Sequence, residues 1–492
     1  MSDIRTLFRQ SSHYLSGRIL IMAAGFISFP ILTRVFSVEE YGVFGLISTT
    51  LLIAMSIAKS GFPSSIVRFH AEFGSAKKLD DFYSTVFLAS VGLSILVALL
   101  LLIIAELLPE HFLGSTMVRL IPIVSLLIVI GCIKDIMTSA LRAEQATKMY
   151  NFIAIVRRYS ALALGIFFIF FFVKGIYGFF VGQAIAGILI LIVLLFYFRK
   201  KLTLKPSNFS SEIFKTTFKY GFPLIWVELG ALVLNYADRF LIQLYLGATA
   251  LGIYTAGYNL ATYVNDIMIY SISYAMTPLY MNILVTKGEQ ETKQFFSKTF
   301  RYYLLVMLPI VFGFIAVGPD LLGLLASSRY TGASVILPYV VIGQLIHASA
   351  IILNSGLFIG KKTHLVSVIT LAACLLNIAL NLFLIPLYGI VGSAQATLIS
   401  YIFFTGIITY FAFKEFSFKI DVKHILIYLA ASIAMFLIIQ NIHAGSHLSS
   451  LIGQVSSGVL IYSIVVLLFD RELRSNLARI FKKNRLEHAK EI

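Results

Sequence analysis

A stripe of polar side chains follows one face of the apolar segment 251–284. At about 100° per residue, these side chains fall within an arc of about 120°. The stripe consists of Thr255, Asn259, Thr262, Tyr263, Asp266, Tyr270, Ser273, Tyr274 and Thr277. The opposite face carries apolar residues such as Leu260 and Met268. A polar stripe along a helix of membrane length is the inverse of a lipid-facing surface, so it predicts a water-filled lumen; hydrogen bonding between helices is the alternative.

Charged side chains stand within other apolar segments, where ionisable groups are costly and normally face a cavity or a partner. In the first half of the chain, Asp135 is accompanied by the cations Arg18, Arg34, Lys59, Arg119, Lys134, Arg157 and Arg158. In the second half, Arg239 is accompanied by the acids Glu228, Asp238 and Asp266. A cation-rich lumen attracts anions, and arginine suits bidentate phosphate binding. The acids are candidates for ion or proton coupling, whereas snorkelling to the headgroups is the alternative for Arg34, Lys59 and Arg119.

Two further segments repeat the polar pattern more thinly. Glu228, Asn235, Arg239 and Gln243 form a narrow stripe on one face of the segment 218–246. His347 shares a face with other polar residues of its segment, and it is either a packed histidine or a proton site.

These residues belong to about fourteen apolar segments, each long enough to cross an apolar bilayer core of about 30 Å. The chain is 59% hydrophobic, with a mean hydropathy of +0.91. The segments are 12–36, 41–62, 82–105, 117–141, 152–173, 176–198, 218–246, 251–284, 299–326, 333–359, 364–386, 389–413, 423–441 and 449–469. Because a helix satisfies its own backbone hydrogen bonds in lipid, we predict an all-α, polytopic membrane protein.

The distribution of lysine and arginine predicts the orientation. Most of the 39 Lys and Arg residues fall at the termini and in the loops of one side. The loops of the other side hold only Lys174 and Arg329. By the positive-inside rule, both termini are cytoplasmic. The net charge of +16 then reflects topology and contact with anionic membrane lipids, and no nucleic-acid partner is expected.

Short matches at a nearly constant offset predict an internal repeat, although chance resemblance between apolar segments is the alternative. Tyr41-Gly42-Val43-Phe44 matches Leu251-Gly252-Ile253-Tyr254, and Ile176-Tyr177-Gly178 matches Leu387-Tyr388-Gly389. Six segments separate the copies, so the repeat is parallel and the substrate path is expected between its halves. We predict two six-helix lobes and two C-terminal helices. The boundaries are an N-lobe at 1–198, a cytoplasmic linker at 199–217, a C-lobe at 218–413, the two helices at 414–469 and a basic cytoplasmic tail at 470–492.

The sequence shows no pattern typical of an enzyme or a metal protein. Cys132 and Cys374 lie in separate segments, so neither a disulfide nor a metal site is expected. The first apolar segment is too long for a cleaved signal peptide and is expected to be retained. No nucleophile elbow, phosphate loop or zinc spacing stands out, and the outer loops are too short for the catalytic loop of a membrane polymerase or ligase. We therefore expect a transporter without a cofactor.

Motifs in both halves resemble those of one transporter family. The N-terminal motifs are Ser12-His13-Tyr14-Leu15, Phe29-Pro30-Ile31-Leu32-Thr33-Arg34-Val35-Phe36-Ser37 and Glu39-Glu40-Tyr41-Gly42-Val43-Phe44. The later motifs are Asp238-Arg239-Phe240-Leu241, Leu246-Gly247 and Gly252-Ile253-Tyr254. Together with the span count, they resemble the Wzx-type O-antigen and polysaccharide repeat-unit flippases, the polysaccharide transporter family of the MATE-like MOP superfamily.

This resemblance implies a flippase in the bacterial inner membrane with two lobes around a central cavity. Its substrate would be an undecaprenyl-pyrophosphate-linked oligosaccharide repeat unit. Alternating access, coupled to an H+ or Na+ gradient, would move this unit from the cytoplasmic to the outer leaflet. The product would supply O-antigen (lipopolysaccharide), capsule or exopolysaccharide assembly, with a polysaccharide polymerase and a chain-length regulator as partners.

The resemblance also suggests roles for the intramembrane residues. The diphosphate would be bound by Arg18, Arg34, Lys134 and Arg239. The sugars would meet Asn235, Asn259, Tyr263, Tyr270 and Tyr274. The candidates for ion coupling are Glu228, Asp238, Asp266 and His347.

Two related transporter classes are the alternatives. A MATE-like multidrug or cation antiporter commonly has twelve helices and often a cationic substrate, which fits the cation-rich first half poorly. A lipid II flippase would carry a further charge in its first helix. Here Ala23, Ala24 and Gly25 stand instead, although Arg18 is placed like the lumenal arginine of those flippases.

Overall fold

The computed structural model describes the backbone of residues 20–109, 114–199, 203–442 and 444–475, and the side chains of these ranges except 264–275 and 277–278. The described backbone is helical apart from its turns, and no strand occurs in it. The helices before the middle of the chain are Leu20–Val35, α2 (Val38–Lys59), α3 (Phe62–Ser75), α4 (Leu79–Leu107), α6 (Ser115–Ala143), α7 (Thr147–Phe171) and α8 (Gly175–Phe198). The predicted all-α, polytopic fold is confirmed.

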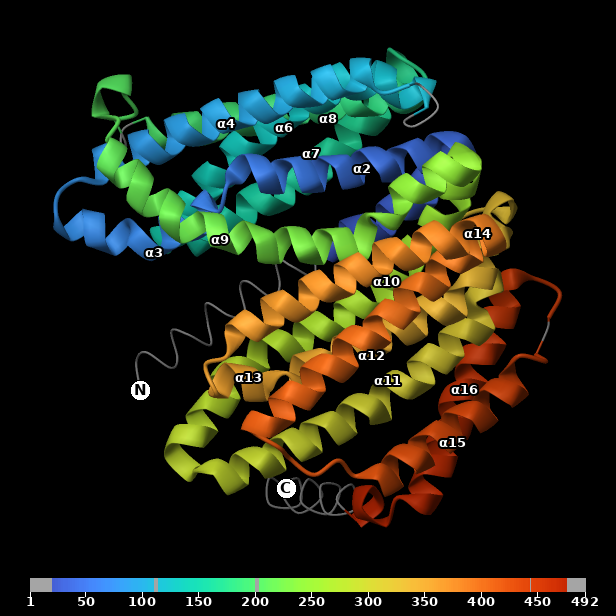
Figure 1. Cartoon of the computed structure of the whole chain (residues 1–492). Helices are drawn as coiled ribbons and strands as arrows, with labels where there is room; N and C mark the ends of the chain where they lie inside the picture. The colour runs from blue at the N-terminus through green and yellow to red at the C-terminus, as the bar shows by residue number, and fades with distance from the viewer. Residues whose placement is uncertain (1–19, 110–113, 200–202, 443, 476–492) are drawn as a thin grey trace, which may run out of the picture. The chain divides into compact units, whose positions relative to one another are not determined.

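The second part of the chain continues as helices after the short helix η1 (Pro206–Asn208). These are α9 (Ser211–Tyr236), α10 (Asp238–Lys287), α11 (Glu289–Leu325), η2 (Ser328–Ile336), α12 (Leu337–Leu353), α13 (Ser355–Ile359), α14 (Thr363–Glu415), α15 (Val422–Ile439) and α16 (His447–Phe469). Figure 1 shows them in chain order from green to red.

The described residues form 11 helical stretches that are long and apolar enough to cross a membrane. Two of these stretches, Ser211–Tyr263 and Thr363–Glu415, each contain a glycine with a non-helical backbone: Gly247 (φ 79°, ψ 178°) and Gly389 (φ 59°, ψ −139°). Each glycine separates two predicted spans, because such dihedrals suit glycine and interrupt the helix. With the apolar helix Leu20–Val35, the stretches account for the fourteen predicted segments.

The chain divides into two compact units. Unit 1 comprises Met1–Asn259 and Ser367–Thr397, and unit 2 comprises Leu260–Val366 and Leu398–Ile492. The boundaries between the units fall within α10 and α14, whereas the predicted lobe boundaries rest on the internal sequence repeat. The lobe boundaries therefore remain a prediction.

Unit 1 is built on a core between α3, α4, α6, α7 and α8. In it, α4 packs on α6 and α7 packs on α8, and Figure 1 shows these helices side by side. Their apolar side chains form one buried cluster that includes Phe62, Phe82, Val86, Ile136, Leu141, Ile153 and Leu194. This core fixes the relative positions of α3, α6 and α7, and α2 packs on α6, so these four helices can carry the polar site described below.

The first predicted match of the repeat is also a contact inside unit 1. Gly42 of α2 packs on the backbone of Ala248 and Gly252 in α10, and Gly252 packs on the carbonyl of Val38 in α2. The second match is shifted in the structure. Gly389 shares its positive φ with Gly175, where α8 begins, and not with the helical Gly178.

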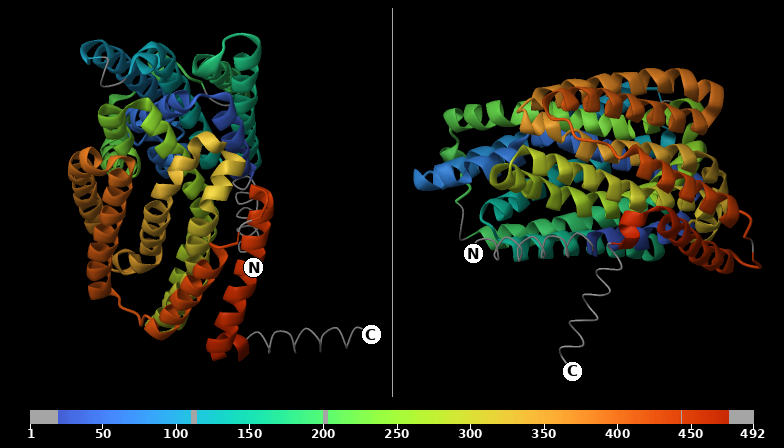
Figure 2. Two further views of the ribbon diagram at one scale, coloured as in Figure 1. Left: turned by 90° about the vertical axis from the view of Figure 1, so that its right-hand side faces the viewer. Right: turned by 90° about the horizontal axis from the view of Figure 1, so that it is seen from below.

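Unit 2 holds a buried ionic cluster at one end of α11. In this unit α15 and α16 run beside α11 (Figures 1 and 2). The Arg301 guanidinium donates to both carboxylate oxygens of Asp470, at 3.0 and 2.8 Å, and to the Tyr428 hydroxyl at 2.9 Å. Asp470 is fully buried and Glu472 is half exposed, and both accept from Arg301. The cluster holds α15 and the end of α16 against α11.

Candidate functional site

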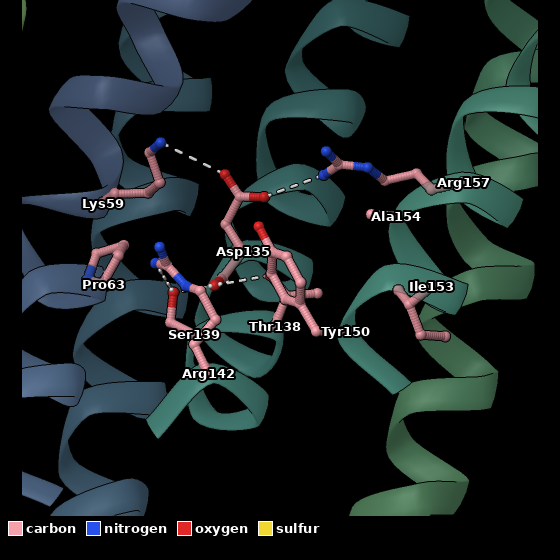
Figure 3. Close-up of a pocket in the computed structure, with 10 residues that line it drawn as sticks. All are labelled: Lys59, Pro63, Asp135, Thr138, Ser139, Arg142, Tyr150, Ile153, Ala154 and Arg157. Carbon is pink, nitrogen blue, oxygen red and sulfur yellow. Dashed lines mark hydrogen bonds and ion pairs between the residues drawn. The ribbon is translucent and has the colours of Figure 1, made fainter. Parts of the chain in front are cut away.

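A polar cavity of about 190 Å³ lies inside unit 1, where α2 ends and α3 begins, and where α6 ends and α7 begins. Figure 3 shows the side chains around it. Its polar lining is Lys59, Asp135, Thr138, Ser139, Arg142, Tyr150 and Arg157, and its apolar lining is Pro63, Ile153 and Ala154. The charge pattern predicts that this end of the unit faces the cytoplasm.

Helix geometry explains how three short stretches build this cavity. Asp135, Ser139 and Arg142 are spaced at i, i+4 and i+7, so they share one face of α6. Tyr150 and Arg157 share a face of α7 in the same way. Both side-chain sets point into the cavity in Figure 3.

Lys59 reaches the cavity from the last residue of α2. Ser60 and Gly61 both have positive φ, at 48° and 71°, and this left-handed pair ends α2. Pro63 then lies in the first turn of α3, where its missing N–H is no loss. Lys59 therefore does not simply snorkel to the headgroups, because its ammonium is held by carboxylates.

Asp135 is the centre of the ion pairs. One carboxylate oxygen lies 3.4 Å from the Lys59 ammonium, and the other lies 3.2 Å from the Arg157 guanidinium (Figure 3). The side chain of Asp135 is only 23% exposed, so it is shielded from most of the surrounding water. Asp135 thus connects α2, α6 and α7.

Arg142 is not balanced by a carboxylate within the described part of the chain. Its guanidinium donates to the Ser139 hydroxyl at 3.1 Å and lies 5.9 Å from the ring centroid of Tyr150. The cavity is therefore lined by three cations and one anion. Glu228 of α9 lies outside the lining, 3.9 Å from the Lys59 ammonium, and its side chain is half exposed.

A second polar cluster in unit 1 is buried where α10 begins. Asp238 and Arg239 are each only 3% exposed. One oxygen of Asp238 accepts from the hydroxyls of Tyr254 and, at 3.5 Å, Ser393. Its other oxygen, and the Nε and Nη1 atoms of Arg239, have no hydrogen-bond partner among the described residues. The Arg239 guanidinium is instead stacked 4.5 Å from the ring centroid of Tyr236.

Further buried oxygens lie at the same depth as Asp238. Asp238 precedes the Gly247 turn by nine residues, while Asn381 precedes and Thr397 follows the Gly389 turn by eight residues. At 1.5 Å per residue, each lies about 12 Å from its turn. The side-chain oxygens of Asn381 and Thr397 are buried and have no partner among the described residues, although the Asn381 amide donates to Asn377.

The other predicted site residues are dispersed. Arg34 is exposed near the end of its helix and donates to the Pro30 carbonyl, whereas Lys134 is half-buried in the interior of α6, with its ammonium directed at α8 beside Gly187. These two cations do not form one binding site in this structure. Arg18 lies outside the described residues, as do the side chains of Asp266, Tyr270 and Tyr274.

The remaining predicted residues have defined surroundings. Asn259 donates to the Tyr41 hydroxyl at 3.3 Å, and Asn235 donates to the Ala231 carbonyl. Tyr263 is half-buried in α10. His347 of unit 2 is stacked on Tyr401, with ring centroids 4.4 Å apart. The roles predicted for all these residues stay predictions.

The sequence interpretation of diphosphate binding did not select Lys59, Asp135, Arg142 and Arg157 as one site. The signal that was available is the i, i+4, i+7 spacing of polar residues on α6. Their assembly depends on where α2 ends and on how α6 packs against α7, which no single segment reveals.

Comparison with known proteins shows the family to which the chain is related. Residues 31–335 match the family described as polysaccharide biosynthesis protein. A probable low-salt glycan biosynthesis flippase, Agl15 of Haloferax volcanii, is 21% identical over 54% of this chain and 57% of its own length. An uncharacterized membrane protein of Methanocaldococcus jannaschii is 22% identical over 69% of this chain and 71% of its own length. The first match thus spans little more than half of that relative.

Solved structures share the fold. The lipid II flippase MurJ, in an inward closed conformation, has a TM-score of 0.78 and 18% identity, covering 95% of this chain and 99% of its own. An inward-facing multidrug resistance MATE family transporter of the MOP superfamily has a TM-score of 0.65 and 15% identity, covering 80% and 93%. None of these relatives is named as an enzyme, in agreement with the prediction.

Proposed function

Because the chain belongs to the polysaccharide biosynthesis protein family, we propose that it is a flippase for undecaprenyl-pyrophosphate-linked oligosaccharide repeat units. It would move them from the cytoplasmic to the outer leaflet of a bacterial inner membrane by alternating access, for the assembly of O-antigen, capsule or exopolysaccharide. Its fold, shared with transporters of the MOP superfamily, supports alternating access. A lipid-linked glycan and membrane lipids are its partners, and a polymerase and a chain-length regulator act on the product.

The cation-rich cavity carries this proposal. Sugars and a diphosphate cannot cross about 30 Å of hydrocarbon unaided, whereas a polyprenyl tail can stay in lipid. Lys59, Arg142 and Arg157 offer an excess of positive charge inside a bundle of membrane helices. Guanidinium groups bind phosphate oxygens in pairs, and such contacts are stronger where water is scarce. The cavity is at the end predicted to be cytoplasmic, where a substrate would be loaded.

The dispersed residues then serve later steps of the same path. We infer that Arg18, Arg34, Lys134 and Arg239 meet the diphosphate as it moves. The sugar contacts come from Asn235, Asn259, Tyr263, Tyr270 and Tyr274, because a tyrosine ring provides both an apolar face and a hydroxyl.

We further infer that Asp238 couples transport to a cation gradient, with H+ and Na+ as the candidates. Asp238, Asn381 and Thr397 place buried oxygens without partners at one depth of unit 1. Buried carboxylates inside a membrane normally take up a proton or a cation, and oxygen ligands suit hard cations. Glu228, Asp266 and His347 remain the other candidates for coupling.

Transport is tested in a deletion strain with intact polysaccharide genes. Undecaprenyl-pyrophosphate-linked oligosaccharide is quantified by mass spectrometry, together with the membrane face that exposes it. Accumulation on the cytoplasmic face, reversed by the wild-type gene, is the expected result. Arg142→Gln and Arg157→Gln should each fail to reverse it, whereas Arg158→Gln, one residue away from Arg157 and outside the cavity lining, should succeed.

The same strain separates the alternatives. Unchanged surface polysaccharide with increased drug sensitivity would establish a MATE-like antiporter instead, and accumulation of lipid II would establish a lipid II flippase.

Coupling is tested in proteoliposomes with Asp238→Asn, which should abolish the dependence of transport on the cation gradient. Glu106→Gln, an exposed carboxylate in the last turns of α4, should keep it.

A further inference from the structure

We propose that Asp135 limits how strongly the cavity holds a diphosphate, so that the headgroup is bound and can still be released. This inference rests on the proposed function, because it concerns the headgroup of the same substrate. It assigns a role in affinity and release to an anion inside an anion-binding cavity.

The geometry places Asp135 in direct competition with a phosphate for the same cations. Its two oxygens are used separately, one by Lys59 at 3.4 Å and one by Arg157 at 3.2 Å. A carboxylate and a phosphate present oxygens to a cation in a similar way. An incoming phosphate therefore meets cations that are already in position. It replaces Asp135 as the acceptor of some of their hydrogen bonds.

The charges of the lining favour an anion with more than one negative charge. Lys59, Arg142 and Arg157 contribute three positive charges, and Asp135 removes one. Glu228, outside the lining, lies 3.9 Å from the Lys59 ammonium and reduces the positive surplus further, but the lining itself still carries more positive than negative charge. A monophosphate diester carries a single negative charge, so it gains less from this positive surplus than a diphosphate diester does.

The Asp135 carboxylate in the cavity also helps the release of the substrate. A transport site must bind its cargo strongly enough to load it and weakly enough to let it go. Without Asp135, three cations would hold the diphosphate with no internal competitor. Removing one unit charge a few Å from the ligand changes the binding affinity on the order of tenfold.

A purely structural role makes the opposite prediction. If Asp135 only held α2 and α7 against α6, its removal would scatter the cations and weaken diphosphate binding. The sign of the affinity change in Asp135→Asn therefore separates the two roles, because asparagine keeps the size of the side chain and removes its charge.

The experiment uses the full chain in proteoliposomes and two water-soluble probes, symmetrical dimethyl diphosphate and dimethyl phosphate. Calorimetry should show that the wild type prefers the diphosphate by about tenfold or more. Asp135→Asn should bind the diphosphate about tenfold more tightly, keep the preference for the diphosphate over the monophosphate and flip the lipid-linked substrate more slowly. Asp135→Glu should behave as the wild type. Glu72→Gln removes an exposed negative charge of α3 and should leave both affinities unchanged.

The outcomes separate this inference from the proposed function. If the wild type binds neither probe, the diphosphate-binding role of the cavity is overturned together with the role of Asp135. If the wild type binds diphosphate but Asp135→Asn binds it equally or more weakly, only the role of Asp135 is overturned. If Asp135→Asn cannot be purified, equal affinity of the wild type for both probes would show that the charge of the anion does not determine binding, and this alone overturns the role of Asp135.

Discussion

Gly42 and Gly252 occupy reciprocal positions in unit 1. A Cβ atom on Gly42 would collide with the carbonyl oxygen of Ala248, and a Cβ atom on Gly252 would collide with that of Val38. Residues 42 and 38 are separated by one helical turn, as are 252 and 248. The contact therefore has the local two-fold relationship expected where two copies of a repeat meet, and it exists only because both residues lack a side chain.

The first prediction concerns this contact. Gly42→Ala should lower the stability of the folded protein by about 1–3 kcal/mol, because a methyl group overpacks a backbone contact that cannot yield easily. The melting temperature in detergent measures this. Gly92→Ala in α4 is the control, since nothing lies within 4 Å of a Cβ there. An unchanged melting temperature for Gly42→Ala would show that α2 and α10 can separate without loss.

The second prediction concerns the start of α8. Oxygens of the Glu40 carboxylate accept from the backbone N–H of Ser37 at 2.9 Å and of Ile176 at 3.2 Å, so one side chain caps α2 and α8. Gly175 has a φ of +77°, and a Cβ there would collide with Glu40. Gly175→Ala should therefore cost about 1–2 kcal/mol through strain and the lost cap. Glu39→Gln, on the neighbouring exposed residue, should leave the melting temperature unchanged.

The third prediction concerns the ionic cluster of unit 2. Asp470→Asn removes the buried counter-charge of Arg301, and such a loss typically costs about 3–5 kcal/mol. Thermal unfolding should show a much lower melting temperature. Glu472→Gln alters a carboxylate whose side chain is 51% exposed, and it should change stability by less than about 1 kcal/mol. Equal effects of the two substitutions would contradict the buried pair.

The fourth prediction concerns pH. Burial alone would raise the pKa of Asp470, but hydrogen bonds from the Leu473 N–H, the Tyr428 hydroxyl and Arg301 lower its pKa below the usual value. The unfolded chain therefore binds a proton at this group first, at a pKa of about 3.9. The stabilisation from Asp470 is complete above that pH and is lost as the pH falls through the lower folded-state pKa. The difference in melting temperature between the wild type and Asp470→Asn should be constant near neutrality and shrink below about pH 4.

The helical spans follow from hydrophobic length alone, and so does the all-α fold. Ser37 and Glu40 form a capping box, and the sequence alone indicates it, because a serine is followed three residues later by a glutamate before an apolar run. The cation-rich cavity is different, because Lys59, Asp135 and Arg157 come from three helices and meet only through their packing. Composition indicated that cations gather in the first half of the chain, but it could not show that Asp135 lies between two of them.

The buried oxygens around Asp238 illustrate the same limit. The sequence singled out Asp238 as a charge inside a span. It could not place Asn381 and Thr397 at the same depth, because that depends on the turns at Gly247 and Gly389. Register across a turn is a property of the folded backbone, and an apolar pattern specifies it only to within a few residues.

The pairing of Arg301 with Asp470 has a consequence for the synthesis of the protein. The two residues are 169 positions apart, so α11 is made long before the carboxylate that neutralises its arginine. During translation Arg301 first gains Asp421, whose carboxylate lies 3.7 Å from its guanidinium in the folded protein, and the buried partner Asp470 is made later. A chain that stops before the end of α16 would lack the buried carboxylate that joins α11 to the end of α16. The buried pair thus makes completion of the polypeptide a condition for a stable bundle.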